Sequence, residues 1–525
     1  MRSKMEDTQP PPQLPTTGTG DYAALACGAA ADRGAAFNAS AALDGCLAIL
    51  EDDSRPLEDR YDEIRSTILP FEHYDTVSPS ELRQLQPRLL QLLRPHPQLL
   101  PQQLGFDEHE DPSTSPAIPL YQSLSRKLLV VLTALHPAPS TELAAVLASF
   151  TSTADAWTTP DTCQLATALM DSTPALRSRS ILIDGLLRDT LKPLFTTRTT
   201  SSARVTAAGR LAIRETTNTR INTDTPAWQS QRPSSIAILS WVLTSILATE
   251  IESAWGLLIP PILTLLDSTV SSTKTRAISM ITLLLVRLDE TASTRTLLSR
   301  TGLAPVFWAS VLPVLSYLPP LTPTREAVPL QRAAYRCLCA LALAREPTDA
   351  RRRAKLLDDV VREGFLRGLA FADEHVRVVV VMVQELAQVV TAMGVWAVRH
   401  LGTVVPALAE LLASPFGGAH TPLLVAAART LGCVVKVGWP RMGRYVAEAL
   451  RGVAVCWVRL GDGALDVKTE LRDGMQEVRN ELRAVVKALK CVVESEEGGR
   501  ERWEALQEGV VEVDRTAFVG LFVES

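Results

Sequence analysis

The sequence predicts an all-α protein, an α-solenoid in which helices stack in pairs. Apolar residues at helical spacing resume at residue 236 and continue with few breaks to the C-terminus. Helix pairs begin roughly every 40–55 residues, a spacing typical of HEAT-like repeats with insertions. Aromatic residues make up only 5% of the 525 residues, as expected where aliphatic side chains fill the spaces between helices.

The segment 255–288 shows the repeat unit most clearly. Pro260 and Pro261 are expected to begin a first helix, because a residue in the first helical turn needs no N–H donor. Asp267 is expected to end that helix, and a Ser/Thr turn leads into a second helix over 273–288. The two apolar stripes are Ile259, Ile262, Leu263 and Leu266, then Ile278, Ile281, Leu285 and Leu288. Neither helix can bury its stripe alone, so such a pair has to pack on another pair.

The same spacing predicts a series of helices across the C-terminal part. They cover residues 236–250, 260–267, 273–288, 303–318, 330–345, 355–370, 373–393, 404–413, 421–437, 442–460, 466–494 and 501–510. The segment 376–383 (VRVVVVMV) is β-branched, which is also typical of a strand. No Gly or Pro interrupts 373–393 and its apolar residues keep helical spacing, so we predict a buried helix that Asp373 caps.

Composition divides the chain into four parts. Residues 1–20 are rich in Pro and Thr and are expected to be disordered. Residues 21–194 are expected to form an N-terminal helical region, and residues 236–525 the HEAT-like α-solenoid. Between them, residues 195–235 are interpreted as a Thr/Ser/Arg-rich surface loop, with binding of an acidic partner or phosphorylation as the alternative.

Net charge and cysteine usage limit the classes of partner. The formal net charge is −5, so no direct nucleic-acid binding is expected. Eight dispersed cysteines form no disulfide framework and favour a reducing compartment. The N-terminus shows no signal peptide, and the longest apolar run, near 236–249, is shorter than the ~18 residues of a membrane span. We therefore expect no membrane partner and a cytoplasmic and nuclear location.

Motifs that would carry chemistry are missing from the sequence. No glycine-rich phosphate loop and no Gly-x-Ser-x-Gly elbow is present, and the GDG turn at 461–463 stands alone. Cys337 and Cys339 fall on different faces of a helix without a second Cys/His pair, so zinc is not expected. His400 is interpreted as a helix-end residue, with a functional role as the alternative. We expect no catalytic, cofactor or metal residues, no cofactor, and a binding protein instead of an enzyme.

A basic cluster and a set of tryptophans are candidates for contact with a partner. The cluster is interpreted as a solvated helix start that Asp358 and Asp359 balance, with nuclear import or an acidic partner as the alternative. Its members are Arg351, Arg352, Arg353 and Lys355. The tryptophans are interpreted as core residues, with hot spots for a partner as the alternative. They are Trp255, Trp308, Trp396, Trp439 and Trp457.

The C-terminal stretch 494–524 is acidic at first and ends in apolar residues that include Phe518 and Phe522. Such a segment either docks on a partner or caps the last helix pair of a solenoid. The sequence leaves both interpretations open.

Two stretches share a more specific pattern. The first, 255–288, presents Trp255, the Pro260-Pro261 pair, Asp267 and Lys274 in that order. The second, 301–341, presents Gly302 in a Thr-Gly-Leu start, Pro319 in the linker LPPLTP and Tyr335 in the helix that follows. With these residues, over about 228–342, the chain resembles the Tel-two-interacting protein two family. That family provides the smaller HEAT-repeat subunit of the Triple T co-chaperone complex.

The resemblance implies a non-catalytic scaffold subunit. Its partners would be a larger HEAT-repeat Tel-two-interacting protein and Tel-two, and indirectly the ninety-kilodalton heat-shock chaperone and the phosphatidylinositol-3-kinase-related kinases. The implied role is the maturation and stability of those kinases in telomere maintenance, DNA-damage signalling and growth signalling. Pro260, Pro261 and Asp267 would be structural, and the residues that bind the partner stay unknown.

A second class of function is compatible with the same fold. A HEAT/armadillo-type nuclear transport or trafficking adaptor would bind cargo peptides along its inner helices. A regular series of Asn or acidic residues on those helices would favour it, and the sequence shows none. Within the first stretch, Asp267-Ser268 stands where the family pattern leads us to expect paired acidic residues, which argues against a charge-based role for that turn.

Overall fold

The computed structural model describes residues 39–68, 79–100, 115–196, 226–415, 420–462 and 469–522, and within these ranges every regular element is a helix. The chain divides into two compact units. Unit 1 is Met1–Ser178 with Gln229–Ala237, and unit 2 is Arg179–Trp228 with Ile238–Ser525. The predicted disordered segment 1–20 and most of the predicted loop, 197–225, lie outside the described residues.

Unit 1 is a set of helices around an aromatic centre. Its helices are α2 (Ala39–Glu51), α3 (Leu57–Ile68), α4 (Pro79–Leu92), η2 (Pro97–Leu99), α5 (Ala117–Ala134), α6 (Thr141–Ala148), α7 (Pro160–Ser172) and η3 (Pro174–Arg177). The ring centroids of Tyr61 and Tyr121 are 5.3 Å apart, and those of Tyr121 and Phe150 are 6.4 Å apart. All three side chains are fully buried, so they link α3, α5 and the end of α6 in one core.

Unit 2 begins with a π-helix and continues with helix pairs. Its first elements are η4 (Ser180–Leu191) and α8 (Lys192–Thr196); α9 (Ala227–Ser230) and α10 (Ser235–Ser245) cross the division between the units. There follow η5 (Ala248–Glu250), α11 (Ile251–Leu266), α12 (Ser271–Asp289), α13 (Ala292–Arg295), α14 (Leu297–Arg300), α15 (Leu303–Val311), η6 (Leu312–Ser316) and α16 (Thr324–Arg345). Next are α17 (Ala350–Asp359), η7 (Val360–Leu366), α18 (Arg367–Ala372), α19 (Val376–Met393), η8 (Gly394–His400), α20 (Leu401–Leu412) and α21 (Thr421–Val437). The last are α22 (Trp439–Met442), α23 (Val446–Asp462), α24 (Thr469–Glu494), α25 (Gly499–Val513) and α26 (Arg515–Phe522).

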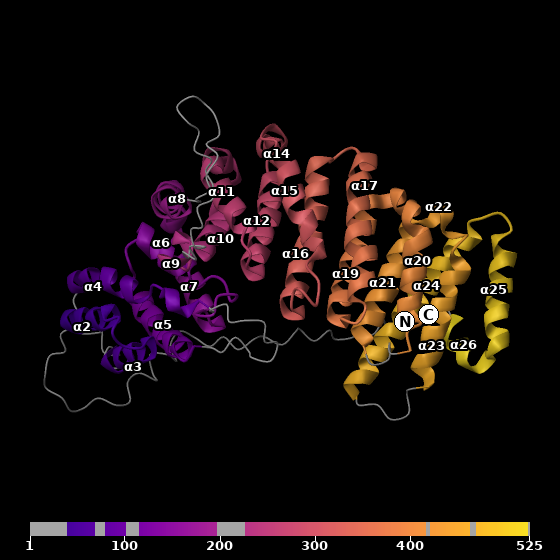
Figure 1. Cartoon of the computed structure of the whole chain (residues 1–525), viewed down its shortest axis with the longest axis horizontal. Helices are drawn as coiled ribbons and strands as arrows, with labels where there is room; N and C mark the ends of the chain where they lie inside the picture. Colours follow the sequence, from indigo (N-terminus) through magenta and orange to yellow (C-terminus); the bar gives the residue numbers. More distant parts are fainter. Residues whose placement is uncertain are drawn as a thin grey trace, which may run out of the picture. The chain divides into compact units, whose positions relative to one another are not determined.

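These helices form two layers within unit 2. The second helices of successive pairs, α12, α16, α19, α21 and α24, pack side by side in that order (Figure 1). Each also packs on the first helix of its own pair, as α12 does on α11 and α21 on α20. The predicted α-solenoid of HEAT-like helix pairs is confirmed, because each apolar stripe is buried by a neighbouring pair.

The β-branched segment forms a buried helix, as predicted. Helix α19 packs between α16 and α21 and buries Val379, Val383, Leu386 and Val390. It starts at Val376, however, and His375 occupies the N-cap position that was expected for Asp373. The Asp373 carboxylate instead accepts a hydrogen bond from the adjacent Glu374 N–H.

The expectation that no helical stretch reaches membrane-spanning length is wrong by length and composition. The stretch Val376–Leu412 is long and apolar enough to cross a membrane, and two bent helix pairs would also qualify if each were one span. The length of this stretch was not apparent from the sequence, because 373–393 and 404–413 were predicted as separate helices. In the structure, 56% of the most apolar 18-residue segment of this stretch is buried inside the protein. Packing between helix pairs therefore accounts for much of its apolar character.

The expectation that Pro260 and Pro261 begin a helix is also wrong. Helix α11 starts at Ile251 and carries both prolines in its interior. Two N–H donors are thereby lost, at a cost of roughly 3 kcal/mol per proline in an isolated helix. Ile251, Ala254 and Leu258, which precede the prolines, are buried, and this burial explains why the helix nevertheless extends through Pro260 and Pro261.

The C-terminal stretch caps the last helix pair. Helix α26 packs on α23, α24 and α25, and its residue Phe518 is buried. The Trp457 indole N–H donates to the Ala517 carbonyl at 2.8 Å, and Arg483 Nε donates to the Gly520 carbonyl at 2.8 Å. Of the two interpretations left open by the sequence, capping is the one that the structure supports.

Gly302 and Gly256 provide a matched test of backbone conformation. Gly302 precedes α15 with φ +66°, whereas Gly256 lies inside α11, and a Cβ at either would meet nothing within 4 Å. We expect Gly302→Ala to lower the free energy of unfolding by about 1–2 kcal/mol, because L-residues are strained in the left-handed region. Gly256→Ala should raise it by about 0.5–1 kcal/mol. Chemical unfolding of the full chain measures both free energies. Two changes of the same sign would contradict the left-handed conformation of Gly302 or the helical conformation of Gly256.

Candidate functional site

The residues that carry the family pattern build the first two complete helix pairs of unit 2 and do not meet in a pocket. Trp255, Pro260, Pro261, Asp267 and Lys274 lie on α11, at its end and on α12; Gly302, Pro319 and Tyr335 lie before α15, in the loop before α16 and on α16. Pro260 and Asp267 are exposed, whereas Pro261, Pro319 and Tyr335 are buried. The Pro319–Pro320 peptide is cis. These positions therefore define packing between pairs.

Polar contacts join the two pairs. The Lys274 ammonium lies 5.3 Å from the centroid of the Tyr317 ring, a cation–π contact between α12 and the end of η6. Gln331, fully buried on α16, donates through Nε2 to the carbonyl oxygens of Val314, Leu315 and Tyr317 at 3.1–3.2 Å. It thereby supplies a donor to the Leu315 and Tyr317 carbonyls and a second donor to the Val314 carbonyl, which also accepts from the Tyr317 N–H at 3.0 Å. The role of Gln331 could not be predicted from the sequence, because a glutamine within a helix usually marks a solvated face.

Tyr335 determines the spacing to the next helix pair. Its side chain is fully buried, and burial raises the pKa of its hydroxyl well above the usual value. Among the described residues the hydroxyl has no hydrogen-bond partner. A Cβ added at Gly364 in η7 would lie 2.6 Å from that hydroxyl, so only glycine permits this approach of η7 to α16.

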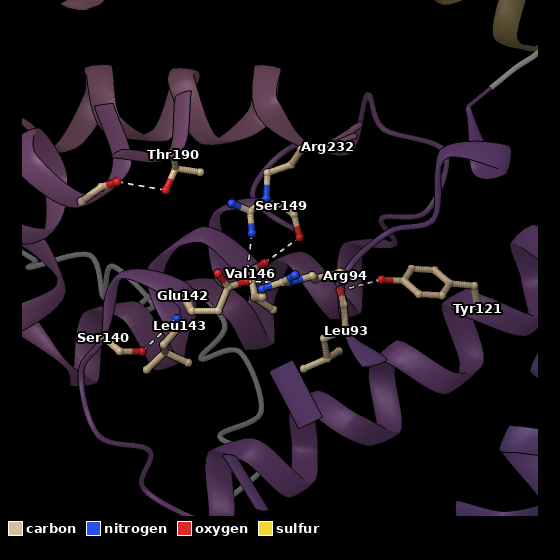
Figure 2. A network of polar contacts seen from close by, with 11 residues as sticks. Leu93, Arg94, Tyr121, Ser140, Glu142, Leu143, Val146, Ser149, Thr190 and Arg232 are labelled. Atoms are coloured by element: carbon tan, nitrogen blue, oxygen red, sulfur yellow. Dashed lines mark hydrogen bonds and ion pairs between the residues drawn. The ribbon is translucent and has the colours of Figure 1, made fainter. Parts of the chain in front are cut away.

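Tyr335 and Tyr121 should respond in opposite ways to loss of the hydroxyl. Tyr121 is equally buried, but its hydroxyl donates to the Leu93 carbonyl at 2.7 Å (Figure 2). We expect Tyr121→Phe to lower the free energy of unfolding by about 1 kcal/mol and Tyr335→Phe to leave it unchanged or raise it by up to about 1 kcal/mol. Urea unfolding followed by circular dichroism measures both. A loss of more than about 1 kcal/mol in Tyr335→Phe would show that its hydroxyl is paired.

Asp267 ends α11, as predicted, but its carboxylate does not cap the turn. No hydrogen bond or ion pair of the Asp267 side chain occurs in the described part of the chain, and the side chain is exposed. By contrast, Asp349 caps α17, because its Oδ1 accepts from the Arg352 N–H at 3.0 Å. The sequence alone could not separate these two aspartates, since both stand beside a helix end.

The difference between the two aspartates can be measured directly. Asp349→Ala should lower the free energy of unfolding by about 1 kcal/mol, because it removes an N-cap. Asp267→Ala should change it by less than about 0.5 kcal/mol, as is usual for an exposed position away from special contacts. Melting temperatures of the two variants provide the comparison. An equal decrease in both would contradict the assignment that, of these two aspartates, only Asp349 caps a helix.

Ion pairs connect the second-layer helices one repeat apart. Glu385 on α19 is 4% exposed and lies 3.1 Å from Arg336 Nε on α16. Burial raises the pKa of Glu385, and the Arg336 charge partly offsets that rise. Further along, Arg429 on α21 contacts Glu477 and Glu481 on α24, at 2.7 Å each. The partners are 48–52 residues apart in the chain, which is one repeat, so helical spacing within one segment could not reveal them.

The basic cluster at the start of α17 is not balanced as expected. Asp358 is buried, and its carboxylate pairs with Arg399 at 2.5 Å and with His400 Nε2 at 2.7 Å. Arg353 instead donates to backbone carbonyls, including that of Ala392 at 3.1 Å. The Asp358 carboxylate therefore pairs with residues of η8 and does not balance the basic cluster. His400 lies at the end of η8, and its contact with Asp358 is structural.

The tryptophans differ in exposure. Trp308 and Trp457 are buried, Trp255 and Trp396 are half-buried, and Trp439 is 56% exposed. The Trp396 ring has the guanidinium groups of Arg351 and Arg399 each 5.8 Å from its centroid. The core interpretation is therefore confirmed for Trp308 and Trp457 and wrong for Trp439, whose exposure depends on how α22 packs and not on local spacing.

The cysteines and acidic residues of the described ranges do not form a reactive centre. No group of three or more His, Cys, Asp or Glu side chains is placed there to hold a metal ion. Burial raises the pKa of Cys337 and of Cys339 to about 12, which leaves both thiols protonated and unreactive at neutral pH. The GDG turn predicted at 461–463 lies partly outside the described residues.

Unit 1 contains a polar network that the sequence analysis did not find. Figure 2 shows Glu142 at the start of α6 between two arginines: Oε1 lies 2.8 Å from Arg94 Nε and 2.9 Å from Arg232 Nη2. Glu142 and Arg232 are 90 residues apart in the chain. The ion pair thus ties the segment 229–237 to the N-terminal helices of unit 1.

The described part of the chain defines a class first: an all-α solenoid of HEAT-like helix pairs. Residues 143–419, just over half of the chain, match the Tti2 family, and this range includes both stretches with the specific pattern. The chain belongs to the Tti2 family, and membership associates it in general with the Triple T complex. No curated protein sequence matches it.

Two solved structures are similar to this chain at low sequence identity. One is the karyopherin Kap121p bound to the extreme C-terminus of the protein phosphatase Cdc14p, with a TM-score of 0.36, 13% identity, and coverage of 90% of this chain and 47% of that chain. The other is the Kap95:Nup1 complex, with a TM-score of 0.37, 11% identity, and coverage of 91% and 60%. The chain spans about half of the length of the first. Values this low give no information on partners or cargo.

Proposed function

We propose that this chain is the smaller, non-catalytic scaffold subunit of the Triple T complex. It would bind a larger HEAT-repeat Tel-two-interacting protein and Tel-two. With the ninety-kilodalton heat-shock chaperone, the complex would support maturation and stability of phosphatidylinositol-3-kinase-related kinases in the cytoplasm and nucleus. The observation that carries the proposal is the match to the Tti2 family over residues 143–419.

The geometry suits an adaptor. Side-by-side packing of α12, α16, α19, α21 and α24 gives unit 2 a continuous helical surface, and contacts such as Arg336–Glu385 hold neighbouring pairs in register. A surface of this kind can bury a large area against another solenoid without reorganising, which limits the entropy lost on binding. Nucleic acid and membrane are not among the proposed partners.

Affinity capture of the tagged full-length chain from its native cells tests the proposal. We expect a larger HEAT-repeat protein and Tel-two to co-purify in near-equal amounts, identified by mass spectrometry, while an unrelated tagged solenoid captures neither. Depletion of the chain should lower the protein levels of the kinases without lowering their transcripts. Recovery of importins or coat proteins in place of Tel-two would favour the transport adaptor and contradict the proposal.

A further inference from the structure

One edge of unit 2 combines exposed apolar side chains with unpaired positive charge. It is formed by the start of α17, by η8 and by α22, and η8 packs on both of the others. We call this surface the basic-aromatic edge. Its members are Arg351, Val395, Trp396, Arg399, Trp439, Arg441 and Arg444. A Cβ added at Gly438 would lie 2.7 Å from Leu401 Cδ2, so the residue directly before α22 lies close to the start of α20.

The apolar part of the edge resembles a binding hot spot. Trp439 is 56% exposed and Val395 is 51% exposed, although both belong to well-packed elements. The guanidinium groups of Arg351 and Arg399 each make a cation–π contact with the Trp396 ring. Tryptophan and arginine are the residues most enriched among those that dominate binding energy. An indole held this far in solvent by a rigid helix turn is suited to receive an apolar side chain from a partner.

The charged part has a local sign opposite to that of the chain. The segments 346–359, 394–400 and 436–444 together contain eight Lys or Arg residues and four Asp or Glu residues, whereas the whole chain has a net charge of −5. Asp358 pairs with Arg399 and Asp349 pairs with Arg352, and these two ion pairs use one base for each acid, so the excess of four positive charges (eight minus four) is unchanged. Within the described part of the chain, Arg441 and Arg444 have no ion pair.

A hollow extends the edge toward α25. It has a volume of about 420 Å³ and is lined by Pro440, Arg441, Gly443, Arg444, Glu496 and Arg502. The one acid in it, Glu496, is paired with Arg502 at 2.8 Å, and Arg502 also donates to the Gly443 carbonyl at 2.6 Å. The charges of Arg441 and Arg444 are therefore available to an anionic group that enters the hollow.

We propose that the basic-aromatic edge binds an acidic segment of a partner protein. Apolar side chains of that segment pack on Trp439 and Val395, and its carboxylates pair with Arg441, Arg444 and Arg351. Charge complementarity and the exposed indole together favour this occupant, because nucleic acid would require a longer basic surface. The inference deepens the proposed adaptor function, on which it rests, by assigning one of its surfaces.

The test uses fluorescein-labelled synthetic peptides that place one Trp or Leu between runs of Asp and Glu. Anisotropy with the full-length chain should show saturable binding that weakens as salt increases, and a peptide with Lys in place of the acids should not bind. We expect Trp439→Ala, and separately Arg441→Glu with Arg444→Glu, to weaken binding at least about tenfold, as expected for hot-spot residues.

Matched control variants lie at the other end of the second-layer helices. Leu321→Ala removes an apolar side chain that is 89% exposed. The double variant Arg325→Glu with Arg377→Glu changes the net charge by the same amount as Arg441→Glu with Arg444→Glu. These variants should bind the peptide like the unmodified chain, with melting temperatures measured for all. Equal weakening in the controls, or tighter binding of duplex DNA or anionic phosphatidylserine vesicles than of the peptide, would overturn the proposal.

Assembly with the larger HEAT-repeat protein and Tel-two is measured separately by size-exclusion chromatography. If the unmodified chain assembles but does not bind the acidic peptide, the inference fails and the proposed function stands. If the unmodified chain binds the peptide but does not assemble, the proposed function fails. The two ideas therefore have distinct outcomes.

Discussion

The packing of each helix pair on the next is the constraint on which unit 2 depends. An amphipathic helix such as α12 buries Ile278, Ile281, Leu285 and Leu288 only because α11 and α16 cover them. Each buried aliphatic side chain of this kind contributes about 1.5–3 kcal/mol, whereas no single pair has enough neighbours to retain that burial alone. Stability is therefore a property of the series, and changes at the contact between two pairs should propagate along it.

Specific contacts then determine how the pairs fit together. Gln331 takes up the carbonyls at the end of η6, Glu385 joins α16 to α19, and Gly364 lets η7 approach Tyr335. All of these contacts keep one helix pair in a fixed relation to the next. Of the residues of the family pattern, Lys274 and Tyr335 take part in contacts of this kind, whereas Pro260 and Asp267 are exposed.

Helix positions could be predicted from the sequence where apolar spacing is clear, as for α21, whose limits Thr421 and Val437 were predicted without error. The start of α11 was predicted too late in the sequence, because Pro260 and Pro261 were interpreted as its first turn. In the folded chain the helix begins at Ile251, because the apolar residues before the prolines are buried. The partners of Glu385, Arg429 and Asp358 could not be predicted, since each lies about one repeat away in the chain. Trp439 was misjudged for the same reason: exposure is set by neighbouring pairs and not by local spacing.

We expect the helix pairs of unit 2 to be folded before any partner binds. Hydrogen–deuterium exchange of the full-length chain, alone and with the larger HEAT-repeat protein and Tel-two, tests this claim most directly. We predict that buried amides of α12, α16, α19 and α21 exchange slowly in both samples, with added protection confined to surface segments. Fast exchange throughout these helices in the free chain, and protection only in the complex, would contradict it.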